Sequence, residues 1–201
     1  MTRIIIFAKA PQPGFAKTRL IPALGMKESA ELAQRMLLNT LHEAMDAGIG
    51  AVELCVTPAI RHSVWRGIRL PAGIEISDQG EGDLGKRLAQ AAQRALDSGD
   101  RVLLIGTDCV EMSAALLCEA ALALCEHDAV IHGTADGGYA LLGLRKFSSL
   151  LFEDIPWSTA AVAALTIARI GQLGWSMHVG QMLHDVDEPQ DLAAFFSYIR
   201  P

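Results

Sequence analysis

The sequence predicts a single α/β domain, spanning residues 1–201, with a mostly parallel sheet flanked by helices. Apolar, strand-like segments alternate with amphipathic, helix-like segments along much of the chain, as in proteins built from βαβ units. Hydrophobic residues make up 51% of the chain and the mean hydropathy is +0.27, as expected for strands buried on both faces. A chain of this length can bury roughly 70% of the surface that it exposes when unfolded.

The order of the segments predicts the topology. Five apolar segments have the composition of buried strands, namely residues 4–8, 51–56, 102–105, 129–132 and 139–144. Three segments between them have helical periodicity, namely residues 28–47, 84–95 and 113–125, the last with Ser113 as N-cap. Right-handed crossovers therefore join the first strands. Residues 133–138 are too few for a crossover helix, so we expect an antiparallel element after residue 132.

Bulk properties limit the partners and the location. The net charge of −6 argues against a nucleic-acid partner, although a local basic loop can still bind a small anion. No apolar segment approaches the roughly 20 residues of a membrane span, and the N-terminus does not resemble a signal peptide, so we expect a cytoplasmic protein. The four cysteines form no C-x-x-C pair, which leaves a zinc knuckle unsupported. The oligomeric state stays open.

Residues 7–20, FAKAPQPGFAKTRL, have the composition of a phosphate-binding loop. Lys9, Lys17 and Arg19 lie where the first strand ends, and Gly14 allows close approach of the backbone to a ligand. The segment matches neither a P-loop nor a dinucleotide-binding fingerprint. We therefore expect a nucleotide-phosphate site of another kind.

Two acids follow predicted strands. Asp108 comes after a buried strand, and Asp136 precedes Gly137 and Gly138 in a tight turn that leads to Tyr139. Such acids can share a Mg²⁺ or Mn²⁺ ion with phosphate oxygens. The alternative roles are structural: Asp108 as the N-cap of a turn, and residues 136–139 as a plain turn between strands.

Two further loops lie beside predicted helices. Gln79, Gly82 and Asp83 precede the second helix, where they suit a base or ribose contact, or where Asp83 is simply the N-cap. Trp157 is either a stacking wall or part of the core, and Ser158 or Thr159 after it is a possible cap of a following helix.

The acids near the end of the chain alternate along an extended segment. Asp185 and Asp187 point to the same side of it, where a metal or acceptor contact is possible. Capping of a last helix that begins at Pro189 is the alternative for Asp187.

Together these segments resemble a known family. The motifs are KAPxPGxxKTRL at residues 9–20, GDLGxR at 82–87, IGTDC at 105–109, DGGY at 136–139, PWST at 156–159 and DVD at 185–187. They look like those of the DUF2064 group of GT-A-fold, nucleotide-diphospho-sugar transferases, and the resemblance covers nearly the whole chain. Members are often labelled glycosyltransferases, some associated with arsenosugar biosynthesis. The group is related to nucleotidyltransferases such as 2-phospholactate guanylyltransferase.

The resemblance implies a role for each motif. Lys17 and Arg19 would contact the phosphates, and Asp108 with Asp136 would bind Mg²⁺ or Mn²⁺. The residues expected near the base or ribose are Gln79, Gly82 and Asp83. The residues expected on the acceptor side are Gly137, Gly138, Tyr139, Trp157 and Asp187. Asp136 or Asp185 is the candidate catalytic base.

Three functions follow from this resemblance. The first is metal-dependent transfer of a sugar from a nucleotide diphosphate to a small acceptor. The second is nucleotidyl transfer from an NTP with release of pyrophosphate, for which the same loop would serve. The third is nucleotide binding without turnover, because Val110 replaces a proline that the family usually places after the Asp-Cys pair.

Overall fold

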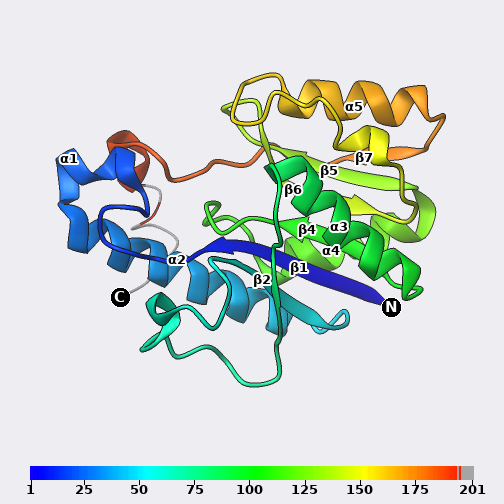
Figure 1. The fold of residues 1–201 in the computed structure, drawn as a ribbon. Coiled ribbons are helices and arrows are strands. Elements are labelled where there is room, and N and C mark those ends of the chain that lie inside the picture. Colours follow the sequence, from blue (N-terminus) through cyan, green and yellow to red (C-terminus); the bar gives the residue numbers. More distant parts are fainter. Residues whose placement is uncertain (194, 196–201) are drawn as a thin grey trace.

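The computed structural model describes residues 1–193 and 195. They form three layers, with a seven-stranded sheet between two layers of helices (Figure 1). The strands are β1 (Thr2–Lys9), β2 (Val52–Thr57), β3 (Glu75–Asp78), β4 (Arg101–Ile105), β5 (Ala129–Gly133), β6 (Tyr139–Leu144) and β7 (Met177–Val179). The helices are α1 (Ile21–Leu24), α2 (Met26–Asp46), α3 (Leu84–Asp97), α4 (Ala114–Glu126) and α5 (Val162–Gln172). Short 3₁₀ turns are η1 (Thr18–Leu20), η2 (Ser63–Trp65), η3 (Ser149–Leu151) and η4 (Pro189–Asp191).

The sheet is mostly parallel, as the sequence predicts. Its strand order is β3-β2-β1-β4-β6-β5-β7. The pairs β1–β2, β1–β4, β2–β3 and β5–β7 are parallel, whereas β6 is antiparallel to both β4 and β5. The antiparallel element expected after residue 132 is therefore confirmed as β6, which lies inside the sheet.

Alternation along the strands divides the core between the two faces of the sheet. One face packs against α2 and α4, with Leu41 and Leu117 fully buried beneath it. The other face packs against α3 and α5, where Ala92 and Ile170 are fully buried. Buried strands with apolar residues on both faces account for the high hydropathy of the chain.

Side-chain caps fix where two of the helices begin. Asp83 accepts a hydrogen bond from the Lys86 amide at 2.8 Å and begins α3, and Ser113 accepts one from the Leu116 amide at 3.3 Å and begins α4. The N-cap role is thus observed for Asp83. Because the cap fixes where α3 begins, it also fixes which residues of the first turn lie near the carboxyl edge of the sheet.

Several elements differ from the sequence prediction. Strands β3 and β7 were not expected, because one is short and mostly exposed and the other has only three residues. A helix capped at residue 158 or 159 was wrong: α5 begins at Val162 after Ala161, and the Thr159 hydroxyl accepts from the Ala161 amide in the turn that precedes the helix. Pro189 opens the turn η4, as predicted at a first helical position, while the rest of the expected last helix lies partly outside the described residues.

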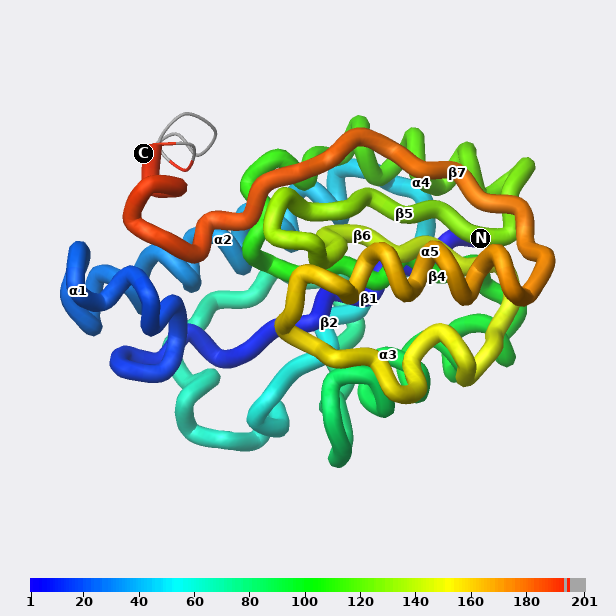
Figure 2. Tube along the Cα trace, turned by 90° about the horizontal axis from the view of Figure 1, so that it is seen from above, coloured from blue at the N-terminus to red at the C-terminus, as the bar shows by residue number. Residues whose placement is uncertain are grey.

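The segment after β7 packs against the region around α1 and α2 at one end of the molecule (Figure 1). Figures 1 and 2 both show the segment after β7 running along the carboxyl edge of the sheet towards α1 and α2. There Leu20, Leu32, Val110, Val186 and Phe195 form a separate apolar cluster. None of the helices in the described part of the chain is both long and apolar enough to cross a bilayer.

Candidate active site

Two adjoining cavities open at the carboxyl ends of β1 and β4. The larger cavity has a volume of about 600 Å³ and lies against Lys9, Gln79 and Asp108. The smaller cavity, of about 350 Å³, lies against the turn that leads into β6. Residues that line both include Arg19, Asp108, Trp157, Ser158 and Asp187. This edge is where open α/β sheets bind their ligands.

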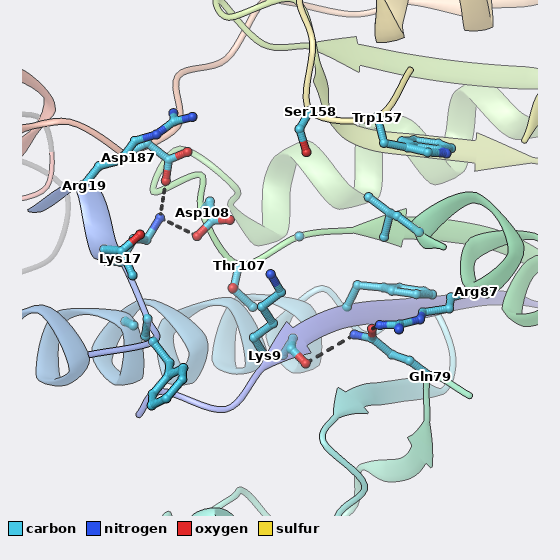
Figure 3. A pocket seen from close by; sticks show the side chains of 18 of the residues that line it. Lys9, Lys17, Arg19, Gln79, Arg87, Thr107, Asp108, Trp157, Ser158 and Asp187 are labelled. Atoms are coloured by element: carbon cyan, nitrogen blue, oxygen red, sulfur yellow. Dashed lines mark hydrogen bonds and ion pairs between the residues drawn. The ribbon is translucent and has the colours of Figure 1, made fainter. Parts of the chain in front are cut away.

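Three cations of the larger cavity have no acidic partner. Lys9, Arg19 and Arg87 line its wall, and none of them forms an ion pair with any residue that the structure describes. They come from the end of β1, the loop before α1 and the first turn of α3 (Figure 3). Unpaired positive charge around a cavity attracts an anion, and phosphate groups match guanidinium and ammonium donors well.

Lys17, in contrast, is fully engaged. Its backbone is left-handed, with φ 47°, which turns the side chain inward so that only 6% of it is exposed. The ammonium contacts Asp108 and lies 2.9 Å from Asp187 Oδ1 (Figure 3). Burial lowers the pKa of Lys17, but the two carboxylates more than offset that effect and the pKa is raised. The lysine therefore stays charged.

Gln79 holds Arg87 in place. The Gln79 amide is buried and donates to the carbonyls of Ala8, at 3.3 Å, and Cys55, at 3.1 Å. Its oxygen is thereby turned towards the Arg87 guanidinium, at 3.4 Å. The Nε atom of Arg87 is buried with no hydrogen-bond partner among the described residues. The sequence predicted Gln79 as a ligand contact, whereas its amide is used to position an arginine that the prediction did not include among the site residues.

Four carboxylates surround the smaller cavity. They belong to Asp108, Asp136, Asp185 and Asp187. Burial and the charges of the other three acids raise the pKa of Asp185 to about 7, against a smaller lowering by Lys17. Burial is the largest cause, and the like charges of the neighbouring acids act in the same direction.

The two candidate bases differ in their hydrogen bonds. Asp136 Oδ1 accepts from the Thr134 hydroxyl and, at 3.0 Å, from the Gly138 amide, so this oxygen closes the turn before β6. The Asp185 carboxylate has no hydrogen bond to any described residue. Its position comes from a β-bridge between Asp185 and Cys109.

The segment after Asp108 is fixed without the proline that the family usually has there. The Val186 amide donates to the Asp108 carbonyl at 2.9 Å, and Val110 is buried beside Val186 in the apolar cluster. Packing and the β-bridge from Asp185 thus hold the turn that positions the Asp108 carboxylate.

The acids suit a magnesium or manganese ion only in part. Carboxylate oxygens are the hard ligands that these ions prefer. Within the described ranges, however, no three His, Cys, Asp or Glu side chains are arranged to hold a metal by themselves, and the Lys17 ammonium lies between Asp108 and Asp187. An ion here would need oxygen ligands from a substrate as well.

An aromatic wall separates the cavities from the core. The Tyr139 and Trp157 rings meet edge to face, with centroids 6.5 Å apart. Gly85 makes room for the indole, since a Cβ there would lie 2.7 Å from the Trp157 Nε1 atom. The Tyr139 hydroxyl is buried and lacks a partner in the described structure, and burial raises its pKa.

The structure gathers most of the predicted site residues, with two exceptions. Those lining at least one cavity are Lys9, Lys17, Arg19, Gln79, Gly82, Asp83, Asp108, Asp136, Gly138, Tyr139, Trp157, Asp185 and Asp187. Gly14, with φ 81°, shapes the loop but lines neither cavity. Gly137 does not either, because it lies against the backbone of Ala160, where a Cβ would come within 2.2 Å of the carbonyl oxygen.

Arg87 and Ser158 are among the cavity residues that the predicted site did not include. Arg87 carried a signal, since it lies four residues after the helix cap Asp83 and therefore on the same side of α3. Ser158 carried none, because a left-handed backbone at a serine cannot be read from its residue type.

Known structures share this architecture. A candidate nucleotide-diphospho-sugar transferase from Desulfovibrio desulfuricans G20 superimposes with a TM-score of 0.90 at 29% identity, covering 97% of this chain and 86% of that one. CMP:2-keto-3-deoxy-manno-octonic acid synthetase, in complex with CTP, gives 0.62 at 10% identity and covers 98% and 97%. The manganese complex of Rv0371c from Mycobacterium tuberculosis H37Rv gives 0.57 at 16% identity and covers 98% and 99%.

These likenesses show the GT-A-like fold of glycosyltransferases and nucleotidyltransferases. No curated protein matches the chain. A family model does, over residues 40–159, and its description is that of uncharacterised proteins conserved in bacteria, DUF2064. This match covers more than half of the 201 residues, and the chain belongs to the DUF2064 family.

Proposed function

We propose that this protein is a metal-dependent transferase that binds a nucleotide-diphosphate sugar in the larger cavity and passes the sugar to a small acceptor. The observation that carries the proposal is the set of unpaired cations, Lys9, Arg19 and Arg87, at the carboxyl edge of the sheet. A diphosphate supplies the negative charge that this wall lacks. The name of the structure from Desulfovibrio desulfuricans G20, at 29% identity, agrees with this donor class.

The cations have separate tasks in the proposed reaction. Lys9 and Arg19 bind the phosphates directly, because both are free of protein partners in the described chain. Lys17 is placed beside the same cavity and stabilises charge on the departing nucleotide. Its left-handed backbone aims the ammonium at this point before any ligand arrives, so little rearrangement is needed.

Asp108 and Asp136 would hold Mg²⁺ or Mn²⁺, with phosphate oxygens and water as the remaining ligands. When bound, the ion supplies positive charge to the diphosphate oxygens while the nucleotide departs. Lys17 then keeps Asp187 as its carboxylate partner, since that contact is independent of Asp108. Because phosphate oxygens complete the ligands of the ion, we expect the ion and the diphosphate to increase each other's affinity for the protein.

Asp185 is the better candidate for a base that takes the proton of an acceptor hydroxyl. Its carboxylate lines the smaller cavity and has no hydrogen bond to the described protein, whereas one oxygen of Asp136 is used by the turn. A free oxygen within the cavity is what a general base requires.

The experiment measures binding and products together. UDP-, GDP- and ADP-sugars are compared with UTP, GTP, CTP and ATP by thermal shift, each with and without Mn²⁺. We expect stabilisation by one nucleotide sugar that increases with Mn²⁺, followed by release of the nucleoside diphosphate when acceptors are added. Stabilisation by an NTP alone, with release of pyrophosphate, would replace sugar transfer by nucleotidyl transfer. Binding with no product from any acceptor would favour an inactive nucleotide-binding protein.

A further inference from the structure

Ser158 has a strained backbone at the junction of the two cavities. Its φ of 65° lies in the left-handed region, which costs a serine free energy relative to glycine. The neighbouring residues impose this conformation. The Thr159 hydroxyl donates to the Pro156 carbonyl at 2.7 Å and accepts from the Ala161 amide at 3.4 Å. Strain that the surrounding structure maintains is often found at ligand sites.

The same loop is fastened to the turn before β6. Gly137 lies against the backbone of Ala160, and its carbonyl accepts from the Ala163 amide at 2.9 Å. Ser158 therefore keeps a fixed position relative to the carboxylate of Asp136, which belongs to that turn. Loop and turn form one unit across the smaller cavity.

The Ser158 hydroxyl is available to a ligand. It lines both cavities and has no hydrogen bond to any residue in the described part of the chain. Figure 3 shows it pointing into the cavity from the side opposite Lys9. The adjacent Thr159 hydroxyl, by contrast, already donates one hydrogen bond and accepts another within the turn. The two neighbouring hydroxyls thus have different tasks.

Charge divides the two cavities. The larger one is lined by four cations, three of them unpaired, and by three aspartates, whereas the smaller one is lined by four aspartates, two of them shared with the larger cavity, and, among the described residues, a single cation, Arg19, at the junction. A carboxylate or phosphate on the sugar itself, beyond the diphosphate that the ion would hold, would meet repulsion from the acids of the smaller cavity. An uncharged group with hydroxyls finds hydrogen-bond acceptors there instead.

We propose that the smaller cavity receives the uncharged, hydroxyl-bearing sugar of the donor, that the Ser158 hydroxyl binds this sugar, and that the acids select against sugars with an anionic substituent. The inference rests on the proposed function, because the sugar must enter with its diphosphate in the larger cavity. It adds the chemical class of the transferred group and a residue that recognises it.

The first test separates the sugar from the nucleotide. Calorimetry compares a nucleoside diphosphate with its sugar, UDP with UDP-glucose or GDP with GDP-mannose, in Mn²⁺, for the wild type, Ser158→Ala and Ser158→Gly. We expect unchanged affinity for the diphosphate and about tenfold weaker binding of the nucleotide sugar, the effect of one lost hydrogen bond. Equal losses for both ligands, or no loss for either, would overturn the role of Ser158.

Thermal unfolding of the same variants checks the strain without any ligand. Ser158→Gly should unfold at a higher temperature than Ser158→Ala, because glycine adopts this backbone without strain. A lower temperature for Ser158→Gly would contradict the strain argument. Thr159→Ala is the matched control: it removes the hydroxyl that holds the turn and should lower the unfolding temperature.

The second test uses the charge of the sugar. UDP-glucose is compared with UDP-glucuronate, or GDP-mannose with GDP-mannuronate, since each pair differs by one carboxylate. We expect the uronate to bind at least tenfold more weakly at low salt, and Asp185→Asn to reduce that difference. Equal or tighter binding of the uronate would overturn the selection by charge. Failure of every nucleotide and nucleotide sugar to bind would instead overturn the proposed function together with this inference.

Discussion

The two edges of the sheet treat charge in opposite ways. At the amino ends of the strands, Arg3 lies 3.4 Å from both Glu53 and Asp100 and also contacts Glu75, while Arg94 contacts Glu53. Every one of these charges has a partner within the chain. The Glu53 side chain at the centre of this network is only 4% exposed, so its charge depends on these partners.

At the carboxyl ends the charges stay unbalanced. Three cations of the larger cavity lack acidic partners in the described protein, and of the four aspartates around the smaller cavity Asp108 and Asp187 pair with Lys17, whereas Asp136 and Asp185 have no ion pair with a described residue. Charged residues thus stabilise the fold at one edge of the sheet, and at the other edge they are the ones that we propose to bind a ligand. Charged side chains occur at both edges, so charge alone does not identify the candidate site. What distinguishes the carboxyl edge is that several of its charged side chains have no partner among the described residues.

We expect the largest effect on the transfer rate from a substitution at the carboxyl edge. Asp108→Ala should lower the transfer rate on the order of 10³-fold, about 4 kcal/mol, because it removes a carboxylate proposed to hold the metal ion. Its free energy of unfolding should change little. Steady-state kinetics and urea unfolding measure the two quantities. Asp100→Asn, at the opposite edge, is the control, and a comparable loss of rate there would refute the division of roles.

Glu53→Gln tests the amino edge. Removing the buried carboxylate leaves Arg3 and Arg94 without its charge and should cost about 3 kcal/mol of unfolding free energy, with nucleotide binding unchanged. Urea unfolding measures the loss. The matched control is Glu75→Gln, because its side chain is 59% exposed and its ion pair with Arg3 should contribute less than about 1 kcal/mol. Equal losses for the two variants would contradict the structural role of burial.

The raised pKa of Asp185 predicts a pH-dependent cost of the acid cluster. Below pH 4 the Asp185 carboxyl is protonated in both the folded and the unfolded protein, so its pKa shift does not affect the free energy of unfolding. As the pH rises, the unfolded chain loses the proton near its ordinary pKa of about 4 and the folded protein only near about 7. Stability therefore falls across this window, by about 4 kcal/mol at most.

Asp185→Asn should remove this pH dependence. The neutral amide has nearly the size of the protonated carboxyl and a similar cost of burial, so we expect little change at pH 4 and a stabilisation of about 4 kcal/mol at most at pH 8. The groups that set the shift are Asp108, Asp136 and Asp187, which raise the pKa, and Lys17, which lowers it. Urea unfolding of the metal-free protein at both pH values measures the effect. A variant that is less stable than wild type at pH 8 would argue against a raised pKa.

We expect the smallest effect from the loss of one exposed cation of the larger cavity. Lys9→Ala should weaken binding of the nucleoside diphosphate about fivefold at low salt and less at high salt, because an exposed cation acts through screened attraction. Unfolding should be unaffected, since Lys9 has no ion pair with a described residue. Lys27→Ala, which removes an exposed pair with Glu31 on α2, is the control and should leave affinity unchanged. Calorimetry at two salt concentrations distinguishes the variants.

The strongly patterned elements could be predicted from the sequence. The buried strands β1, β2, β4, β5 and β6 were all expected, because their apolar residues are contiguous. Strand β3 could not be recognised: its sequence, EISD, is mostly polar and exposed, and it is defined by pairing with β2. Short edge strands depend on tertiary contacts rather than on local pattern.

The site was predictable where chemistry follows a strand end. Asp108 and Asp136 could be located because each directly follows or precedes an apolar strand. Their surroundings could not. The partner of Lys17 at Asp187 lies 170 residues away, and nothing local indicates that contact. Likewise, Gly137 looked like a residue that approaches a ligand, but it approaches the backbone of Ala160.

The late position of Asp185 and Asp187 has a consequence for synthesis. Chains grow from the amino terminus, and their early parts can begin to fold while the rest is still being made. The cations of the larger cavity and Asp108 are present long before the segment that bridges Cys109 to Asp185. A chain that terminates early would thus keep its phosphate-binding residues but lack the acids opposite them. Under the proposed function, premature termination would remove the proposed base Asp185 and the Lys17 partner Asp187, while the residues proposed to bind phosphate would remain.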